Sequence, residues 1–317
     1  MPRHVLVSGA AGFIGSHVVD RLLVSGARVT GIDCFDAYYD RAIKETHLES
    51  ARGHDGFRLL ELDLATDDLA PAFDGVDAVV HLAAVPGVRA SWGDSFELYT
   101  RNNVIATQRL LEASRHASLD IFAYVSSASV YGDGATEAVS ETFLPAPHSP
   151  YGVTKLAAEH LAHLYRKVHG LPTTALRVFS CYGPRERPDK AIQKFLTAVQ
   201  EGRSIEVYGD GSQLRDFTYV GDIVDGILAA LEHAPVGEAI NLARGKPETL
   251  RTVIETIESL TGAQLAASYG DTEPGDVRVT HACIDKARTL LGYEPSTSLQ
   301  DGIAAQWACV QGTALPR

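Results

Sequence analysis

The chain has 317 residues, of which 45% are hydrophobic and 21% charged, a composition typical of a soluble globular protein of about two domains. Its net charge of −12 and the lack of a run rich in lysine and arginine argue against nucleic acid as a main partner, because phosphate binding needs a basic surface. No apolar run approaches the ~18 residues that a membrane helix needs, and glycine interrupts the N-terminus too often for a signal peptide, so we expect a cytoplasmic protein with no membrane partner.

The start of the chain predicts a strand, a glycine turn and a helix. Residues 4–7 (HVLV) form a short apolar run, and residues 13–23 have the apolar spacing of a helix that packs on a sheet. Between them Gly9, Gly12 and Gly15 form a GxxGxxG pattern. This pattern lets backbone approach a pyrophosphate at the positive end of a helix.

The next three strands are predicted at residues 27–33, 57–64 and 77–84, and they continue the alternation of strand and helix expected of a doubly wound sheet. The first of them ends at Asp33, about where an acid binds an adenosine ribose, so dinucleotide binding is predicted. A carboxylate there repels a 2′-phosphate, which favours NAD over NADP. The ends of the other two strands are expected near the adenine and near the middle of the cofactor. The residues concerned are Asp63, Leu64, Ala83 and Ala84.

A fifth strand, IFAYVSSASVYG, places a serine cluster at its carboxyl end, where open α/β sheets bind ligands. The cluster comprises Ser126, Ser127 and Ser129. Serines at strand ends also cap and turn, so the cluster alone leaves both interpretations open. His81, at the end of the fourth strand, could be an acid or base, but a packed structural histidine is the favoured interpretation.

A helix is predicted to begin after Ser149, a plausible N-cap, with Pro150 in the first helical position. It places Tyr151 and Lys155 one turn apart on one face. A tyrosine that acts as a base near pH 7 needs its pKa lowered by about three units, or roughly 4 kcal/mol. One Lys⁺ at ~4 Å supplies about that much at an effective dielectric of ~20. The same pattern also occurs as an ordinary exposed helix pair.

The second half alternates less regularly. A sixth strand is predicted at residues 173–184 and a helix at 187–202, followed by further strands and helices without repeats or long linkers. We therefore expect an α/β fold with a Rossmann-type doubly wound parallel sheet. Residues 1–176 would form the NAD-binding domain, with about 212–243 returning to it, and residues 177–317 would mainly form a smaller interleaved α/β substrate domain. The four cysteines lack metal-ligand spacing, so reduced thiols and no metal site are expected.

With the glycine turn, Ser127, Tyr151 and Lys155 in this order, the chain resembles the extended short-chain dehydrogenase/reductase superfamily over essentially its whole length. Residues 208–223 and 273–295 look like the segments with which nucleotide-sugar epimerases hold the nucleoside diphosphate, which identifies the second domain as nucleotide-sugar-binding. The resemblance implies that the pyrophosphate and a nucleoside ribose are held by Arg215 and Asp276.

The residues beside the serine distinguish chemistries within this superfamily. Sugar 4,6-dehydratases carry Asp-Glu before V-Y-G and xylose-forming decarboxylases carry a Glu, whereas this chain has Ala128 and Ser129. Neither side chain can serve as that acid or base, which leaves oxidation and reduction at one carbon.

Segments 32–51, 83–92 and 180–195 look most like UDP-glucuronic acid 4-epimerases. By this resemblance, hydroxyls line a carboxylate pocket, one arginine lies close to it and another lies near the phosphates or the uronate. The hydroxyls are those of Ser127, Ser129 and Ser180. Arg187 is the arginine close to the carboxylate pocket, and Arg89 is the one near the phosphates or the uronate. Further contacts to the cofactor are expected from Phe13, Ile14 and Asn103.

The resemblance implies NAD-dependent epimerisation at C4 of a UDP-sugar, most similar to conversion of UDP-glucuronate to UDP-galacturonate through a 4-keto intermediate. Tyr151 would be the base, Ser127 would hydrogen-bond the same sugar oxygen, and Lys155 would keep the phenol acidic and anchor the nicotinamide ribose. A UDP-glucose/UDP-galactose 4-epimerase is the main alternative, although such enzymes usually have asparagine at the position of Ser180. Decarboxylation of UDP-glucuronate and a non-catalytic NAD-binding regulator are the others. Relatives commonly form homodimers through two helices, here residues 103–116 and 151–165.

Overall fold

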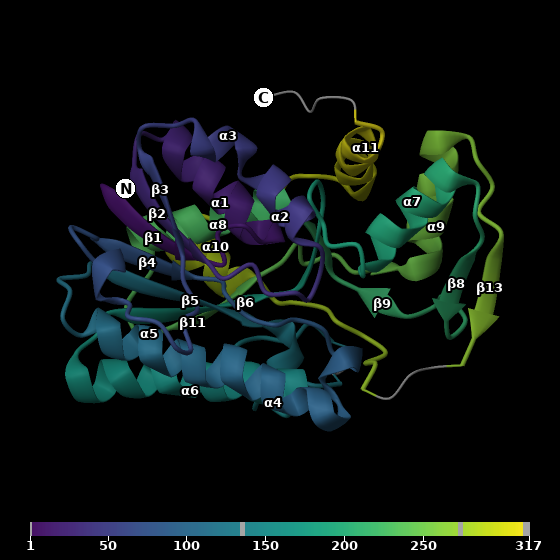
Figure 1. Ribbon diagram of the computed structural model, residues 1–317. Helices are drawn as coiled ribbons and strands as arrows, with labels where there is room; N and C mark the ends of the chain where they lie inside the picture. Colours follow the sequence, from purple (N-terminus) through teal and green to yellow (C-terminus); the bar gives the residue numbers. More distant parts are fainter. Residues whose placement is uncertain (1, 134–136, 272–274, 313–317) are drawn as a thin grey trace.

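The computed structural model describes residues 2–133, 137–271 and 275–312. Figure 1 shows a sheet covered by helices on both faces, with a smaller lobe at one end of the sheet. Within the described residues, no helix combines the length and the apolar character needed to cross a membrane.

The central sheet has seven parallel strands, because short apolar runs that alternate with helices can bury both faces of a strand. In β1, Val7 lies between Gly31 and Val80 of its two neighbours and is fully buried. The strand order reverses between β1 and β4, as the doubly wound prediction requires. In spatial order the strands are β11 (Ala239–Leu242), β6 (Thr173–Val178), β5 (Ile121–Ser127), β4 (Ala78–His81), β1 (His4–Ser8), β2 (Arg28–Asp33) and β3 (Phe57–Glu61). The predicted Rossmann-type fold is confirmed.

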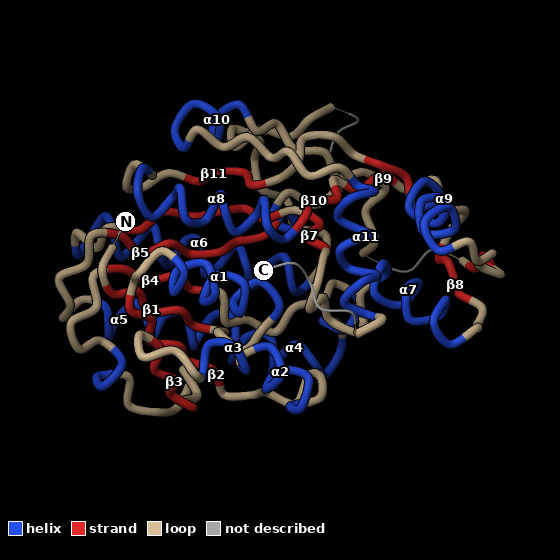
Figure 2. The backbone as a smooth tube through the Cα atoms, turned by 90° about the horizontal axis from the view of Figure 1, so that it is seen from above, coloured by secondary structure: helices blue, strands red, loops and turns tan. Residues whose placement is uncertain are grey.

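Helices cover the two faces of this sheet and enclose separate apolar clusters (Figures 1 and 2). On one face lie α1 (Phe13–Val24), α8 (Val220–His233) and α10 (Asp285–Leu291), with α2 (Arg41–His47) and α3 (Glu49–Arg52) near β2 and β3. On the other face lie α4 (Phe96–Tyr99), a π-helical turn (Thr100–Ile105), α5 (Ala106–Ser114) and α6 (Pro150–His169).

The smaller lobe packs helices against short two-stranded sheets around an apolar cluster of its own. The helices are α7 (Ala191–Glu201), α9 (Leu250–Thr261) and α11 (Leu299–Val310). The strand pairs are β7 (Ser180–Tyr182) with β10 (Phe217–Tyr219), β8 (Ile205–Tyr208) with β13 (Ala267–Gly270), and β9 (Leu214–Arg215) with β12 (Glu248–Thr249).

Two predicted elements differ from the structure on either side of one loop. The sixth strand is two strands, because β6 ends at Val178 and β7 leaves the large sheet to pair with β10. The helix predicted from residue 187 begins at Ala191. Residues 183–190 instead form a loop at the end of the sheet, and apolar periodicity carries no information about such a loop.

The glycine turn between β1 and α1 leaves no room for side chains at two positions. Gly9 has φ +72°, and a Cβ there would lie 2.8 Å from the backbone nitrogen of Ala83. A Cβ on Gly15 would lie 2.0 Å from the carbonyl oxygen of Gly9. Helix α1 therefore approaches β1 more closely than any other residue type would allow.

Replacing Gly15 with alanine should lower the free energy of unfolding by about 3 kcal/mol or more, because the new methyl group meets rigid backbone and α1 must move away from the sheet. Gly53→Ala is the matched control, since its Cβ would have no neighbour closer than 4.0 Å. Urea denaturation of both variants measures the difference. Equal stability of the two variants would refute this account of the turn.

Candidate functional site

A cavity of about 800 Å³ lies between the ends of the large sheet and the smaller lobe. It brings together residues that are up to about 270 positions apart in the sequence. The predicted site residues that line it are Gly9, Gly12, Phe13, Ile14, Gly15, Asp33, Asp63, Leu64, Ala83, Ala84, Arg89, Ser127, Ser129, Tyr151, Lys155, Ser180, Arg187, Arg215 and Asp276.

The glycine-turn end of the cavity is suited to a dinucleotide. The N-cap of α1 is Gly12, which offers no side-chain acceptor, so the first amides of the helix remain available to a phosphate. Asp33 accepts hydrogen bonds from the amides of Ala11 (3.0 Å) and Phe35 (2.9 Å), which orient its carboxylate at the end of β2. Burial raises the pKa of Asp33, and a hydrogen bond from a ribose hydroxyl would favour its ionised form.

Asn103 differs from the other predicted site residues because it lies behind the cavity wall. Its side chain is 1% exposed and bonds protein groups on both ends: the carboxamide oxygen accepts from the amide of Val85 (2.8 Å), and the nitrogen donates to the Val85 carbonyl (3.0 Å) and to Thr154 (3.0 Å). The polar atoms of this side chain are thus bonded to protein groups, and Asn103 is not among the residues that line the cavity. It fixes the position of Val85, which does line the cavity.

His81 is the packed structural histidine that the sequence favoured. Its two ring nitrogens hydrogen-bond the hydroxyls of Ser8 (2.6 Å) and Thr107 (2.9 Å), and the ring is 1% exposed. Burial, together with the charge of Lys155, lowers the pKa of His81 to about 3. A ring so bound has neither a free nitrogen nor the pKa for acid or base work near pH 7.

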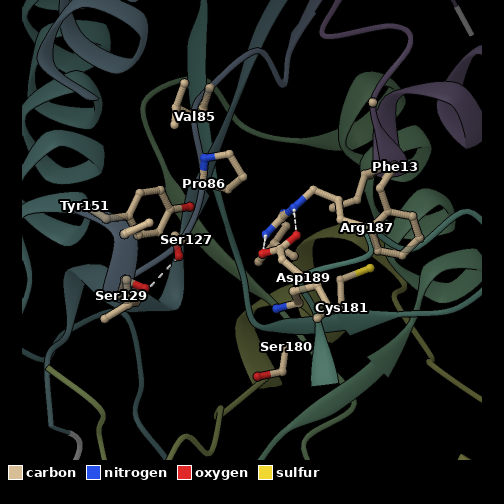
Figure 3. A pocket seen from close by; sticks show the side chains of 18 of the residues that line it. Phe13, Val85, Pro86, Ser127, Ser129, Tyr151, Ser180, Cys181, Arg187 and Asp189 are labelled. Carbon is tan, nitrogen blue, oxygen red and sulfur yellow. Dashed lines mark hydrogen bonds and ion pairs between the residues drawn. The ribbon is translucent and has the colours of Figure 1, made fainter. Parts of the chain in front are cut away.

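Tyr151 and Lys155 emerge from the first turns of α6, as predicted. The hydroxyl of Ser149 accepts from the amide of Gly152 (3.1 Å), and Pro150 occupies the first helical position. Figure 3 shows the hydroxyl of Tyr151 and that of Ser127 on the same side of the pocket.

The sequence predicted that Lys155 lowers the pKa of Tyr151, but in the structure other groups do so. Burial raises it, while the hydroxyl of Ser127 and then the guanidinium of Arg187 lower it. Lys155 is directed away, because its ammonium donates to the carbonyl of Val125 (2.7 Å) and lies over the ring of Tyr124. The spacing of one helical turn determines where Tyr151 and Lys155 leave α6. The position of the lysine's ammonium is determined by the carbonyl of Val125 in the neighbouring strand β5.

A buried polar network lies behind Lys155 and was not predicted. Glu159, one turn further along α6, forms an ion pair with Arg177 of β6 (2.5 Å) and accepts from Ser126 (2.6 Å). Arg177 also donates to Tyr131 (2.7 Å). Burial lowers the pKa of Lys155 to about 7, and the charge of Glu159 opposes that shift. The i, i+4 spacing from Lys155 to Glu159 was the available signal.

Hydroxyls and one ion pair surround the part of the cavity in front of Tyr151. The amide of Ser129 donates to the hydroxyl oxygen of Ser127 (3.1 Å), while Ser180 lies across the pocket (Figure 3). Arg187 faces them and donates two hydrogen bonds to Asp189, Nε to Oδ1 and Nη2 to Oδ2, each 2.9 Å. Sequence analysis missed Asp189, although the pattern Arg-x-Asp was present.

The two residues assigned to the nucleotide, Arg215 and Asp276, line another part of the cavity. Asp276 pairs with Arg89 (2.5 Å), whose guanidinium lies 3.9 Å from the centre of the Tyr208 ring. Arg215 lies in the same wall, and burial lowers its pKa. Tyr208 stood in the segment singled out from the sequence but was not assigned a role. Glu273 and Pro274, which begin the second such segment, lie outside the described residues.

Together these groups line one cavity that contains a phenol, a serine hydroxyl and an ammonium. Such a set can remove a proton from an alcohol beside a hydride acceptor and return it later. The described ranges contain no cluster of three or more His, Cys, Asp or Glu that could hold a metal ion.

Comparison with known proteins agrees with this geometry. Residues 5–243 match the family described as NAD dependent epimerase/dehydratase. A Bacillus subtilis (strain 168) protein called an uncharacterized UDP-glucose epimerase is 41% identical over 96% of each chain. A UDP-glucuronate 4-epimerase from Thermodesulfobacterium geofontis is 36% identical, over 95% of this chain and 94% of that one. The crystal structure of a UDP-glucuronic acid 4-epimerase from Bacillus cereus, with UDP-glucuronic acid and NAD, is 42% identical and covers 98% of this chain and 99% of that one, with a TM-score of 0.95.

Replacing Lys155 with methionine should stabilise the nucleotide-free protein at neutral pH. The folded-state pKa of about 7 lies below the ordinary lysine value of 10.5, so the folded protein binds fewer protons than the unfolded chain between these values. The cost of burying the ammonium is therefore greatest below pH 7 and disappears as the pH rises toward 10.5. Thermal unfolding at pH 6 and pH 9 should show a larger gain at pH 6.

The matched control is Lys167→Met, an exposed position on the same helix. It should give no gain at either pH. A Lys155→Met variant that is less stable than the parent at pH 6 would contradict a costly buried ammonium.

Proposed function

Because this chain belongs to the NAD dependent epimerase/dehydratase family, we propose that it is an NAD-dependent isomerase that inverts C4 of UDP-glucuronate to give UDP-galacturonate. The observation that carries this proposal is the surroundings of Tyr151. Hydroxyls and Arg187 face its phenol, and no carboxylate stands at Ala128 or Ser129 to drive a dehydration. The two UDP-glucuronate epimerases described above support the choice of sugar.

The residues fit NAD at the glycine-turn end. The free amides at the start of α1 would bind the pyrophosphate, Asp33 a ribose hydroxyl, and Asp63 with Leu64 the adenine edge. NAD⁺ bound there would supply a reversible hydride acceptor for the sugar. Lys155 would bind the nicotinamide ribose. The ribose hydroxyls would then replace the water that the buried ammonium has lost.

Tyr151 is assigned the proton transfer. As phenolate it accepts the proton of the C4 hydroxyl and later returns it, and Ser127 hydrogen-bonds the same oxygen. The charges around the phenol fit this role, because Ser127 and Arg187 both favour the phenolate and offset part of the effect of burial. No second acid or base is needed, since the proton leaves and returns through one group.

Inversion requires the 4-keto sugar to turn over before it is reduced. The enzyme therefore has to hold the nucleotide firmly and the sugar loosely. Arg215, Arg89 and Asp276 lie at the far end of the cavity and are assigned to the UDP part. Ser127, Ser129 and Ser180 are assigned to the carboxylate, which they would keep out of alignment with the ketone so that carbon dioxide is not lost.

Epimerisation of UDP-glucose is the second candidate. It is favoured by the Bacillus subtilis relative and by the pairing of Arg187 with Asp189, whose opposite charges offset each other.

Three further proposals concern organisation. Residues 1–176, with about 212–243, form the NAD-binding domain and the remainder mainly binds the nucleotide sugar. The protein forms a homodimer through α6 and through α5 with the π-helical turn before it. Exposed apolar residues on these elements support the proposal, namely Ile105, Val153, Leu164 and Val168. It works in the cytoplasm, supported by its four free thiols.

Replacing Tyr151 with phenylalanine should lower kcat by about 10²–10⁴-fold, because the proton acceptor is lost while the ring is retained. NAD binding and the melting temperature should change little. Tyr165→Phe removes a hydroxyl from the same helix outside the cavity and should keep near-parental activity. A Tyr151→Phe variant with near-normal turnover would disprove the assigned role.

The choice of sugar is tested by supplying the NAD-loaded protein with UDP-glucuronate and UDP-glucose separately and resolving the products by proton NMR. UDP-galacturonate should form far faster than UDP-galactose, because hydroxyl donors meet the carboxylate. Equal rates, or faster epimerisation of UDP-glucose, would favour the second candidate. A UDP-pentose product would instead indicate decarboxylation.

A further inference from the structure

The sugar end of the cavity contains a carboxylate of the protein's own. Asp189 binds Arg187 through two parallel hydrogen bonds, the geometry in which arginine also grips a free carboxylate ligand. Figure 3 shows this pair opposite Tyr151 and Ser127. The side chain of Arg187 is 15% exposed and that of Asp189 is 41% exposed, and both residues line the cavity.

The loop that carries the pair is fixed from two sides. The ring of His17 on α1 hydrogen-bonds the carbonyl of Pro184 (2.8 Å), and Arg185 forms an ion pair with Asp20 of the same helix (2.8 Å). Arg185 holds this position with φ +64°, a conformation that non-glycine residues seldom adopt.

The second attachment comes from the C-terminal helix. Gln306 of α11 donates to the buried carboxyl of Glu186 (2.8 Å). Because Glu186 directly precedes Arg187, the backbone under Arg187 is held from both α1 and α11. The orientation of the guanidinium is then set by its side-chain contacts: two hydrogen bonds to Asp189 and the ring of Tyr38, whose centre lies 5.7 Å from Arg187 Cζ.

Both members of the pair are charged. Burial opposes the charge on each, but the hydrogen bonds between them raise the pKa of Arg187 and hold the pKa of Asp189 below its usual value. The two groups thus cancel each other's charge. A uronate entering this end meets an arginine whose Nε and Nη2 are already bound to a carboxylate.

We propose that Asp189 determines how the uronate is held: it occupies the paired donors of Arg187, so that the sugar carboxylate is left to the serine hydroxyls. This inference rests on the proposed function, because it concerns a sugar that must turn over within the site. A two-bond grip by Arg187 would hold the carboxylate in one orientation and resist that rotation. Asp189 is in this sense a positioning residue, which acts on the sugar through Arg187.

The test uses Asp189→Asn in the full-length, NAD-loaded protein. Calorimetric titration with UDP-glucuronate and with UDP-glucose gives the affinity of each, and initial rates give kcat. Asparagine cannot neutralise Arg187, so the freed guanidinium should bind UDP-glucuronate about tenfold more tightly, the effect expected of one charge-assisted interaction. The affinity for UDP-glucose should change much less, and kcat for the uronate should fall while its KM falls too.

Two further variants distinguish this role from a structural one. Asp189→Glu keeps a carboxylate and should restore the parental affinities. Asp189→Asn combined with Arg187→Lys removes the planar donor pair and should abolish the gain in uronate affinity. Melting temperature and NAD content of each variant check that the fold is retained.

The ratio of the two affinities decides the outcome. If both ligands bind more tightly to Asp189→Asn by the same factor, the effect is a general one of charge on the shared diphosphate and the proposal fails. It also fails if uronate affinity is unchanged or weaker. Failure of the parental protein to epimerise UDP-glucuronate would overturn the proposed function instead, and the affinity ratio can be measured whether or not turnover occurs.

Discussion

Burial of the Lys155 ammonium is the constraint on which the arrangement of the site depends. An ammonium taken out of water costs several kcal/mol unless protein groups replace the water. Here the carbonyl of Val125, the ring of Tyr124 and the charge of Glu159 offset part of that cost, and the lowered pKa of Lys155 reflects the part that remains. Each of these groups belongs to β5 or α6, so the lysine binds the helix to the strand whose end carries Ser127.

Glu159 is a second buried charge, and it too needs protein partners in place of water. Its carboxylate is itself buried and is stabilised by Arg177 of β6 and by Ser126. Arg177 in turn bonds Tyr131, whose hydroxyl donates to Asn241 of β11 (2.7 Å). The hydrogen bonds that start from Glu159 thus link α6 to three neighbouring strands, β5, β6 and β11, and support the residues around Tyr151.

The wall of the cavity opposite Tyr151 is formed by a loop and not by a helix or strand. Residues 183–190 have no regular secondary structure, yet contacts from α1 and α11 hold them in place. Loops anchored in this way commonly carry specificity, because they can vary without disturbing the sheet. The residues proposed to transfer the proton therefore stand on helix α6 and strand β5, and the pair of Arg187 and Asp189 stands on an anchored loop.

The sequence by itself determined the Rossmann-type sheet, the glycine turn and the helix that begins at Pro150, because periodicity and spacing along the chain encode these features. Arg89, Arg187 and Arg215, which line the cavity, were indicated by the family resemblance and not by spacing. The sequence could not determine which groups the polar ends of the side chains contact. Lys155 reaches the carbonyl of Val125 and leaves Tyr151 to Ser127 and Arg187, while Asn103 bonds Val85 behind the wall. The break after β6 and the pairing of Arg187 with Asp189 were likewise decided only by the tertiary structure. Both depend on elements distant in sequence, β10 for the break and α1 with α11 for the loop, and such contacts leave no local pattern in the chain.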